Sequence, residues 1–506
     1  MLKKNQNGNF LQTNLSLFSL SFFVIFLDKI RNLLTNIFTF FIFDLKKKNL
    51  FFVFFMQFIG LYLWKIFDPF LIITSQNYGF QFFYSIILNK NFGLCLTFGI
   101  DGFGLLFILL TIFIFTLCFF FLDKTTIVFR KILISLYLLL LLNFTLLDFF
   151  LFYLAFECSL IPMFFIIGLF GSRPRRIKAT FYLFIYTTAT AFLTLFCILY
   201  ILIQVGSTFY LDLLTFNFTI NEQKFLWFCI FLTFATKIPV IPFHIWLPEA
   251  HVEAPTIGSV ILASILLKLG GYGFLRFLIP IFSKATYFFL PFVFSLAICS
   301  VVYASFTTIR QIDLKRIVAY SSIAHMNLVV LGIFSLNVQG IDGALYLMIG
   351  HGIVSSALFF LVGFMYDRFH TKLLRYYGGL ITVMPLFGIF FFLFSMGNIG
   401  FPTTSNFIGE FLILVGIFIK NPFIAIFAGF GIILSAVYSF WLYTRVFFGT
   451  LKTDMWFIFS DLTKKEILII LPLTFLMFFF GVTSIYILNI STITTEIFLI
   501  NCAFYV

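Results

Sequence analysis

Six ionisable side chains stand inside long apolar stretches of this sequence, and their chemical types suit the transfer of protons. They are Glu157, Lys237, Lys268, His325, His351 and Glu410. An ionisable residue within a membrane is costly, so it usually faces a bundle interior or a water-filled path. Burial disfavours the charged form of carboxyl and amine groups, and histidine titrates near neutral pH. A row of such groups predicts a proton pathway.

Some of these residues also have a purely structural explanation. Glu157 can pair with Lys237 or Lys268 merely to satisfy its burial, and a lone histidine in an apolar helix is often a satisfied polar residue. However, His325 and His351 occupy consecutive apolar spans, each with Ser or Thr neighbours. We favour a functional interpretation, because ionisable residues inside a membrane are functional by default.

The stretch 235–276 combines charge with broken helical structure. Its sequence, ATKIPVIPFHIWLPEAHVEAPTIGSVILASILLKLGGYGFLR, contains Lys237 and Lys268. Four prolines interrupt it: Pro239, Pro242, Pro248 and Pro255. A proline-broken helix at membrane depth is tolerated only where the freed backbone groups find partners or line a cavity. Charges and breaks together predict that this stretch lines an ion pathway.

Metal binding is the alternative for the histidines, and their spacing disfavours it. No H-x-x-x-H or H-E-x-x-H pattern occurs, and His244 and His251 would need an unwound backbone to act together with Glu249 and Glu253. The seven cysteines form no C-x-x-C pair and stand mostly in apolar runs. No P-loop is present, and no G-x-G-x-x-G follows a strand. The sequence therefore predicts no metal, nucleotide or redox cofactor on this chain.

The composition is that of a polytopic membrane protein. Hydrophobic residues make up 62% of the 506 residues, charged residues make up 10%, and the mean hydropathy is +1.12. A soluble chain of this length needs more polar surface. The 85 phenylalanines fit the codon usage of an AT-rich organelle genome. The net charge of +13 arises from short basic loops, a pattern that sets membrane orientation, so we expect no binding to nucleic acid.

The apolar spans predict an all-α membrane protein with about 14 transmembrane helices of ~20 residues each. One or two of these crossings are expected from the N-terminal region or from the stretch 68–99. Five basic loops recur along the chain: 123–131, 171–178, 310–316, 368–375 and 445–465. They share one side of the membrane only if 380–419 crosses once, as a helix broken near Pro402. That side is the cytoplasmic or matrix side.

Paired broken segments in two halves of a chain indicate an inverted-repeat transporter. The expected divisions run in order along the chain. They are an N-terminal basic extension with short apolar runs (1–48), N-terminal transmembrane helices (49–149), a first half with a broken helix near Pro239 (150–285), a second half with a broken helix near Pro402 (286–450), and a C-terminal loop with the last transmembrane helix (451–506).

Five segments resemble the antiporter-like membrane subunits of respiratory complex I, the proton-pumping NADH:ubiquinone oxidoreductase. They are PFHIWLPEAHVEAPTIGSVILASILLKLGGYG at 242–273, FECSLIP at 156–162, DLKRIVAYSSIAHMN at 313–327, GHGIVSSALFFLVG at 350–363 and IDGFGLLF at 100–107. The resemblance extends over 95–450. Two of the sister subunits in that complex typically have a lysine at the position where this chain has the acidic residue Glu410. Glu410 and the H-x-E-A-P block are therefore more similar to the remaining antiporter-like subunit.

The resemblance implies a role for each ionisable residue in the row. It implies that Glu157 and Lys237 form an ion pair at the input of the channel, and that Lys268 is the central relay. The relay then continues through two histidines to a far-end acid: His325, His351 and Glu410. The family's fold consists of two inverted antiporter-like repeats, each with a broken helix.

The resemblance also implies an assembly and a location. The whole complex pumps protons with energy from quinone reduction elsewhere, so NAD, FMN, iron–sulfur clusters and ubiquinone belong to other subunits. The implied partners are the other membrane-arm subunits, including the two sister antiporter-like subunits, together with accessory subunits and membrane lipids. The implied location is the mitochondrial inner membrane, crossed several times. Residues 1–48 are longer and more basic than the family needs, and we expect them to contact accessory subunits.

Two other classes of function compete with a respiratory subunit. A cation/proton antiporter subunit of the related multisubunit family shares the 242–273 block, and such a chain would exchange Na⁺ or K⁺ in vesicles that contain it alone. A structural membrane subunit with an inactive channel would tolerate neutral substitutions along the charged row. The organelle-like composition and Glu410 favour the respiratory subunit.

Overall fold

The structure is a computed structural model, and it describes residues 45–68, 79–89, 94–122, 126–452 and 459–504. Most of the N-terminal extension expected at 1–48 lies outside the described residues. Residues 57–506 form one compact unit. Eleven helical segments of the described residues are long and apolar enough to cross a membrane, and the shorter α18 adds an apolar helix. The number of about 14 crossings stays a prediction.

The first part of the chain contains one hairpin and a series of helices. In order these are α2 (Leu45–Ile66), β1 (Gln81–Asn89), β2 (Leu94–Ile100), α4 (Gly102–Phe121), α5 (Ile127–Thr145), α6 (Phe149–Cys158), α7 (Leu160–Phe170), α8 (Arg176–Val205), α9 (Tyr210–Thr215), α10 (Ile220–Lys237), α11 (Trp246–Glu253), α12 (Thr256–Ile261), the π-helix η2 (Leu262–Leu266), α13 (Leu267–Gly273), the π-helix η3 (Phe274–Leu278) and α14 (Ile279–Ile281). The segments from α12 to α14 continue one another as a single buried span.

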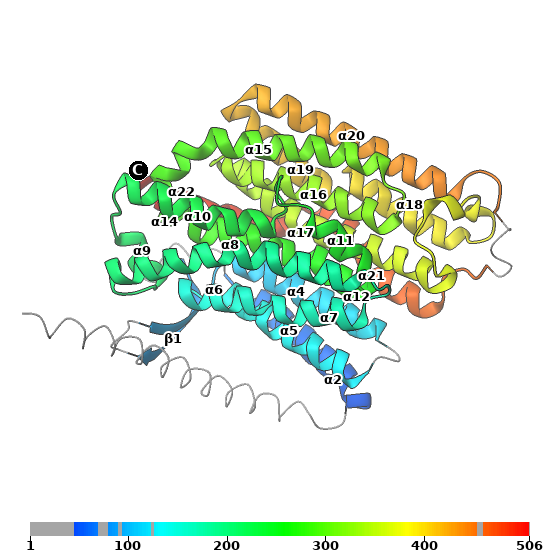
Figure 1. The fold of residues 1–506 in the computed structure, drawn as a ribbon, viewed down its shortest axis with the longest axis horizontal. Coiled ribbons are helices and arrows are strands. Elements are labelled where there is room, and N and C mark those ends of the chain that lie inside the picture. Colours follow the sequence, from blue (N-terminus) through cyan, green and yellow to red (C-terminus); the bar gives the residue numbers. More distant parts are fainter. Residues whose placement is uncertain (1–44, 69–78, 90–93, 123–125, 453–458, 505–506) are drawn as a thin grey trace, which may run out of the picture. The chain divides into compact units, whose positions relative to one another are not determined.

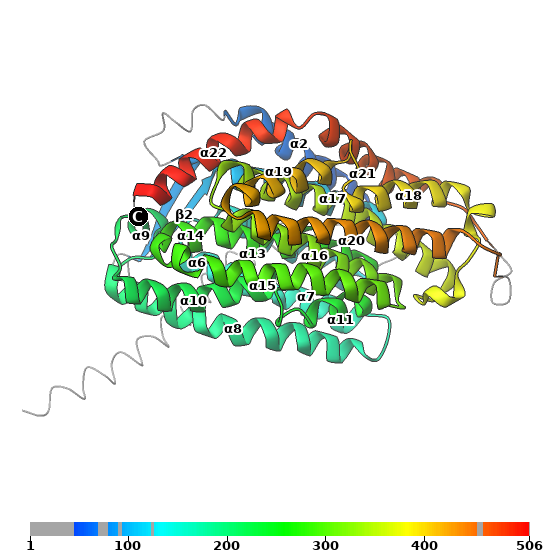
Figure 2. The same ribbon diagram turned by 90° about the horizontal axis from the view of Figure 1, so that it is seen from above.

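The second part of the chain is helical. Its elements are α15 (Ser283–Arg310), α16 (Leu314–Phe334), α17 (Val338–Phe369), the 3₁₀ turns η4 (Leu374–Tyr376) and η5 (Leu380–Thr382), α18 (Pro385–Ile399), α19 (Ser405–Lys420), α20 (Pro422–Phe447), α21 (Lys464–Val482) and α22 (Ile485–Phe504). Helices α16, α17 and α19 pack side by side (Figure 1), and Figure 2 shows them from above.

One of the two places expected to supply an additional crossing does not supply it, because the described part of the stretch 68–99 contains a hairpin. Strands β1 and β2 pair antiparallel, with Tyr84 opposite Phe98 and Ile86 opposite Leu96. Each strand is rich in aromatic and β-branched residues, which favour pleated structure. Neither apolar run reaches the ~20 residues of a membrane-spanning helix. Average hydropathy alone does not separate such a hairpin from a helix.

Two helical paths are interrupted inside the bundle. Helix α10 ends at Lys237, and the chain turns through 238–245 before α11 begins at Trp246. Helix α18 ends at Ile399, and Gly400 follows in a left-handed conformation with φ +75° before α19. Each interruption exposes helix ends where polar groups become available inside apolar surroundings. Each is close to one of the ionisable residues singled out in the sequence.

Helix α17 lies at the centre of the packing and is buried along its apolar length. A glycine on α19, Gly409, permits the close approach of these two helices. A Cβ atom on Gly409 would lie 2.6 Å from the backbone nitrogen of Leu347 in α17. Small residues let membrane helices pack backbone against backbone, because lipid offers no hydrophobic driving force between them. This contact sets the distance between the helices that carry His351 and Glu410.

We expect Gly409→Ala to destabilise the helical bundle, because the added methyl group overpacks the α17–α19 contact at a cost of about 1–3 kcal/mol. The measurement is the amount of intact protein after a graded heat challenge in membranes. Gly429→Ala on α20 is the matched control, since a Cβ atom there meets nothing within 4 Å. Equal heat resistance of the two variants would contradict the inferred close packing.

Candidate functional site

Five of the six ionisable residues lie in the protein interior, each on a different helix. Their exposed fractions are 3% for Lys237 on α10, 0% for Lys268 on α13, 1% for His325 on α16, 1% for His351 on α17 and 4% for Glu410 on α19. Glu157, at the end of α6, is half-buried. Groups this deeply buried need polar partners in the protein or water, because burial without a partner is costly.

Lys268 and His351 are in direct contact. Lys268 Nζ lies 2.9 Å from His351 Nδ1 and donates to the carbonyl oxygen of Ala263 at 2.5 Å. When Lys268 is charged, its ammonium group has only donors, so Nδ1 of His351 accepts and the neutral ring then carries its proton on Nε2. Ala263 belongs to the π-helix η2, directly before Lys268. The side chain of Lys268 therefore donates to a carbonyl group of the adjacent π-helical turn.

The contacts continue from His351 to Glu410. The rings of His351 and His325 have centroids 5.6 Å apart, and His325 Nδ1 lies 3.3 Å from Glu410 Oε1. Neither ring nitrogen of His325 makes a well-oriented hydrogen bond within the described part of the chain. The two groups are thus close, but their present orientation is not that of proton transfer. Four helices, α13, α17, α16 and α19, together position one buried row.

Lys237 is placed differently from the ion pair that the family resemblance implies. Its Nζ atom donates to the carbonyl oxygen of Phe156 at 3.4 Å and lies 4.0 Å from the centre of the Phe156 ring. The charges of Lys237 and Glu157 interact, but no direct ion pair joins them among the described residues. The half-buried Glu157 side chain and the buried lysine share this end of α6, and no hydrogen bond between them is seen among the described residues.

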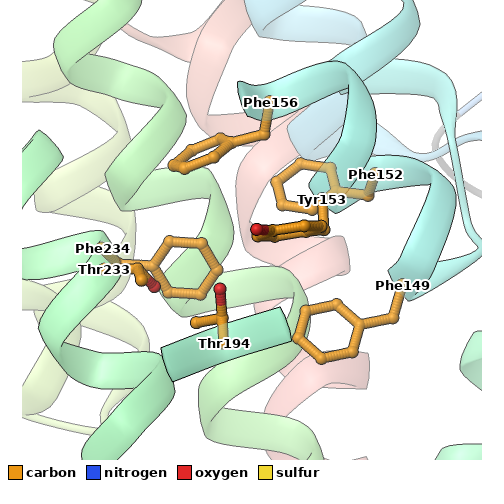
Figure 3. Close-up of a pocket in the computed structure, with 7 residues that line it drawn as sticks. All are labelled: Phe149, Phe152, Tyr153, Phe156, Thr194, Thr233 and Phe234. Atoms are coloured by element: carbon orange, nitrogen blue, oxygen red, sulfur yellow. The ribbon is translucent and has the colours of Figure 1, made fainter. Parts of the chain in front are cut away.

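A small cavity lies beside the Lys237 contact (Figure 3). It is lined by Phe149, Phe152, Tyr153, Phe156, Thr194, Thr233 and Phe234. The centre of a water molecule has about 10 Å³ of room there, which is close to the minimum for a single water. The hydroxyl groups of Thr194 and Thr233 already donate to carbonyl oxygens of their own helices. The cavity therefore offers a bound water few polar partners and mainly aromatic walls.

Several buried charges were not singled out as functional in the sequence. Arg276 pairs with Asp101 at 2.5 Å, with both side chains buried. Lys315 and Lys372 belong to the basic loops 310–316 and 368–375, yet only 2% and 1% of them are exposed. No local signal separates a buried lysine in a basic loop from a solvated one, because its partners come from distant segments.

The described residues contain no group of three or more His, Cys, Asp or Glu side chains that could hold a metal ion. His251, the nearest candidate from the sequence, stacks on Phe359 with ring centroids 4.6 Å apart and an interplanar angle of 5°. Neither of its ring nitrogens has a hydrogen-bond partner within the described ranges. The buried row itself brings together amine, imidazole and carboxyl groups, which are types that can accept and release protons.

Comparisons with known proteins give the same assignment from sequence and from structure. The family described as "NADH:quinone oxidoreductase/Mrp antiporter, TM" matches residues 147–435. NADH-ubiquinone oxidoreductase chain 4 of Arabidopsis thaliana is 51% identical over 421 residues, which are 82% of this chain and 83% of that protein. The protein of the same name from Chondrus crispus is 49% identical over 407 residues, 80% of this chain and 83% of that protein.

Two solved structures have the same fold. A chain of respiratory complex I from Thermus thermophilus with bound NADH superposes with a TM-score of 0.78 and 25% identity, covering 89% of this chain and 98% of that chain. A chain of the Mrp complex from Dietzia sp. has a TM-score of 0.75 and 17% identity, covering 89% of this chain and 52% of that chain. At such low identity, the second likeness concerns the fold alone.

Gly400→Ala should displace the carboxyl group of Glu410. Gly400 has φ +75°, and an added Cβ atom would clash with Glu410 Oε2. Gly206→Ala is the matched control, because Gly206 has φ +82° but no atom within 4 Å of the added carbon. Each variant carries the left-handed backbone strain of about 1–2 kcal/mol, and only Gly400→Ala adds the clash.

The measurement is a density map of both variants, read for the 3.3 Å contact between His325 Nδ1 and Glu410 Oε1. We expect this contact to lengthen in Gly400→Ala and to persist in Gly206→Ala. An unchanged contact in Gly400→Ala would mean that the second helix break does not position the Glu410 carboxyl group.

Proposed function

The chain belongs to the NADH:quinone oxidoreductase/Mrp antiporter transmembrane family, and from this membership we propose that its buried row carries the translocated proton. The observation that supports the proposal is the unbroken neighbourhood from Lys268 through His351 and His325 to Glu410. Ionisable groups at this depth mark proton relays in membrane proteins. The reaction is vectorial proton transfer, driven by quinone reduction on other subunits.

The transfer begins at the contact between Lys268 and His351. Lys268 Nζ gives its proton to His351 Nδ1, and the resulting imidazolium releases the proton on Nε2 towards His325. Because the ring centroids lie 5.6 Å apart, this second step needs a bridging water or a ring rotation. His325 then passes a proton to the carboxylate of Glu410, and each histidine returns to its first tautomer before the next cycle.

The charge state of Lys268 is set from the other side by Glu157 and Lys237. Opposite charges stabilise one another. When Lys237 loses its neighbour Glu157, its positive charge is no longer balanced and repels the proton on Lys268. Separation of Glu157 from Lys237 therefore favours release of the Lys268 proton towards His351. No direct ion pair joins the two side chains among the described residues, so their separation breaks no hydrogen bond between them.

The proposed assembly is respiratory complex I in the mitochondrial inner membrane, since relatives with about half of their residues identical are named for that enzyme. The two sister antiporter-like subunits, accessory subunits and lipids are the proposed neighbours. NAD, FMN, iron–sulfur clusters and ubiquinone are the proposed cofactors of other subunits. A cation/proton antiporter subunit is the second candidate, favoured only by the fold shared with the Mrp complex.

Lys268 provides the direct test of the relay. We expect Lys268→Met to assemble but to lose proton translocation through this chain, because methionine cannot carry a proton. Lys268→Arg should fail as well, since arginine keeps the charge but does not release its proton. The measurement is the number of protons translocated per electron pair by the assembled complex in closed vesicles. Lys284→Met replaces an exposed lysine and serves as the control.

Undiminished proton stoichiometry in assembled Lys268→Met would exclude this relay. Glu157→Gln should lower turnover, and unchanged turnover would remove Glu157 from the mechanism. Exchange of Na⁺ or K⁺ by vesicles that contain this chain alone would favour the antiporter.

A further inference from the structure

The C-terminus of α11 ends inside the protein, and every carbonyl group of its last turn has a partner. The last four carbonyl groups of a helix accept no hydrogen bond from within the helix, so they need donors from elsewhere. Here His251 O accepts from Ser259 Oγ at 3.2 Å, Val252 O from Lys372 Nζ at 2.5 Å, Glu253 O from the Ser172 amide at 3.3 Å, and Ala254 O from Lys315 Nζ at 2.9 Å.

Two of the four donors are buried lysines that carry charge to the negative end of the helix. Lys372 also donates to Ser172 Oγ at 2.8 Å, and Lys315 contacts Ser259 Oγ at 3.5 Å. A cation at a helix C-terminus interacts favourably with the partial negative charge there, and more so where water is excluded. Burying an ammonium group is expensive.

These lysines join the end of α11 to the helices that carry the two histidines of the proposed proton row. Along the chain, α11 comes after Lys237, at the end of α10, and before Lys268, on α13. Lys315 lies in the first turn of α16, the helix of His325, and Lys372 follows α17, the helix of His351. A partly exposed ion pair between Arg316 and Glu249, at 2.6 Å, joins α11 to α16 as well.

We propose that Lys315 and Lys372 are positioning residues for proton transfer, because they hold the broken-helix segment α11 in register with the helices that carry His325 and His351. This inference rests on the proposed function. Neither lysine belongs to the row, and each acts through the carbonyl groups of α11. Small displacements matter here, because the 2.9 Å contact between Lys268 and His351 crosses the boundary between the two halves.

The surroundings of Lys372 make this arrangement sensitive to pH. Burial lowers the pKa of Lys372 to about 8, although the carboxylates of Glu253 and Asp313 favour its charge; Arg173 opposes it. The ring of Tyr366 on α17 lies 4.9 Å from its Nζ atom. Lys372 is therefore charged below about pH 8 and neutral above, and its attraction to the end of α11 weakens as the pH rises.

The test compares Lys372→Met and Lys315→Met with Lys452→Met in the assembled complex. Lys452 is the matched control, because it is only partly buried and also donates to a backbone carbonyl, that of Arg375 at 2.6 Å, which lies outside α11. Two quantities are measured: protons translocated per electron pair in closed vesicles, and hydrogen exchange of the α11 amides. Lys268→Met, measured in parallel, defines the share of translocation that depends on this chain.

We expect Lys372→Met and Lys315→Met to lose most of that share, and amide exchange in α11 to accelerate roughly tenfold with the loss of a charged hydrogen bond. Lys452→Met should resemble the wild-type protein. Normal stoichiometry with normal α11 exchange in both variants would overturn the inference while leaving the relay intact. Normal stoichiometry in Lys268→Met would overturn the relay itself, and this inference with it.

The arginine variants decide the question if the methionine variants do not assemble. The double variant Lys315→Arg and Lys372→Arg keeps both charges at high pH, because arginine does not release its proton. Its proton stoichiometry should therefore stay constant where that of the wild-type protein declines above about pH 8. A purely structural role predicts the same pH profile for both proteins. Identical profiles would therefore contradict the inference.

Discussion

The cost of holding charge where water is scarce governs this structure. Lys268 is completely buried, and so is the row of groups that follows it. In an apolar medium a charge must be neutralised, paired or hydrogen-bonded, because an isolated charge without water is very unfavourable. The chain meets this requirement with carbonyl oxygens, imidazole rings and a carboxyl group drawn from several helices. The groups that reduce this cost can also accept and release protons, so the solution to the burial problem is itself a path.

The interrupted helices supply much of what these charges need. A continuous membrane helix uses its backbone groups internally and offers nothing to a buried cation. The ends of α10, α11 and α18, and the π-helical turn η2, release carbonyl groups into the interior. Lys268 takes the carbonyl group of Ala263, and Lys372 takes that of Val252. Breaks and charges therefore occur together, because the freed carbonyl groups need donors and the buried ammonium groups need acceptors.

Sequence patterns anticipated the ionisable row but not its connections. The spans around His325 and His351 are apolar enough to place these rings in the membrane interior, and the prolines near 239 and 402 mark the two breaks. The pairing of Lys268 with His351, and of His325 with Glu410, joins residues far apart in the chain, so no local pattern specifies it. The hairpin at 81–100 was missed because its apolar strands resemble half of a membrane helix. In the sequence, Lys315 and Lys372 resemble ordinary loop cations, because the carbonyl groups to which they donate belong to the distant end of α11.

The ionisable groups are not evenly connected, and the place without a polar contact indicates where proton transfer can be controlled. From Lys268 to Glu410 the groups are near neighbours, so transfer among them needs only local rotations or a water. Lys237 contacts the Phe156 carbonyl instead of an acid, and no polar contact joins it to Lys268 in the described part of the chain. A mechanical or electrostatic signal is most effective at a gap, because small movements there change interaction energies steeply when the dielectric constant is low. Helix α11 follows Lys237 along the chain and packs against α16, the helix of His325. The lysines that hold its end therefore belong to the same argument as the proton-carrying residues.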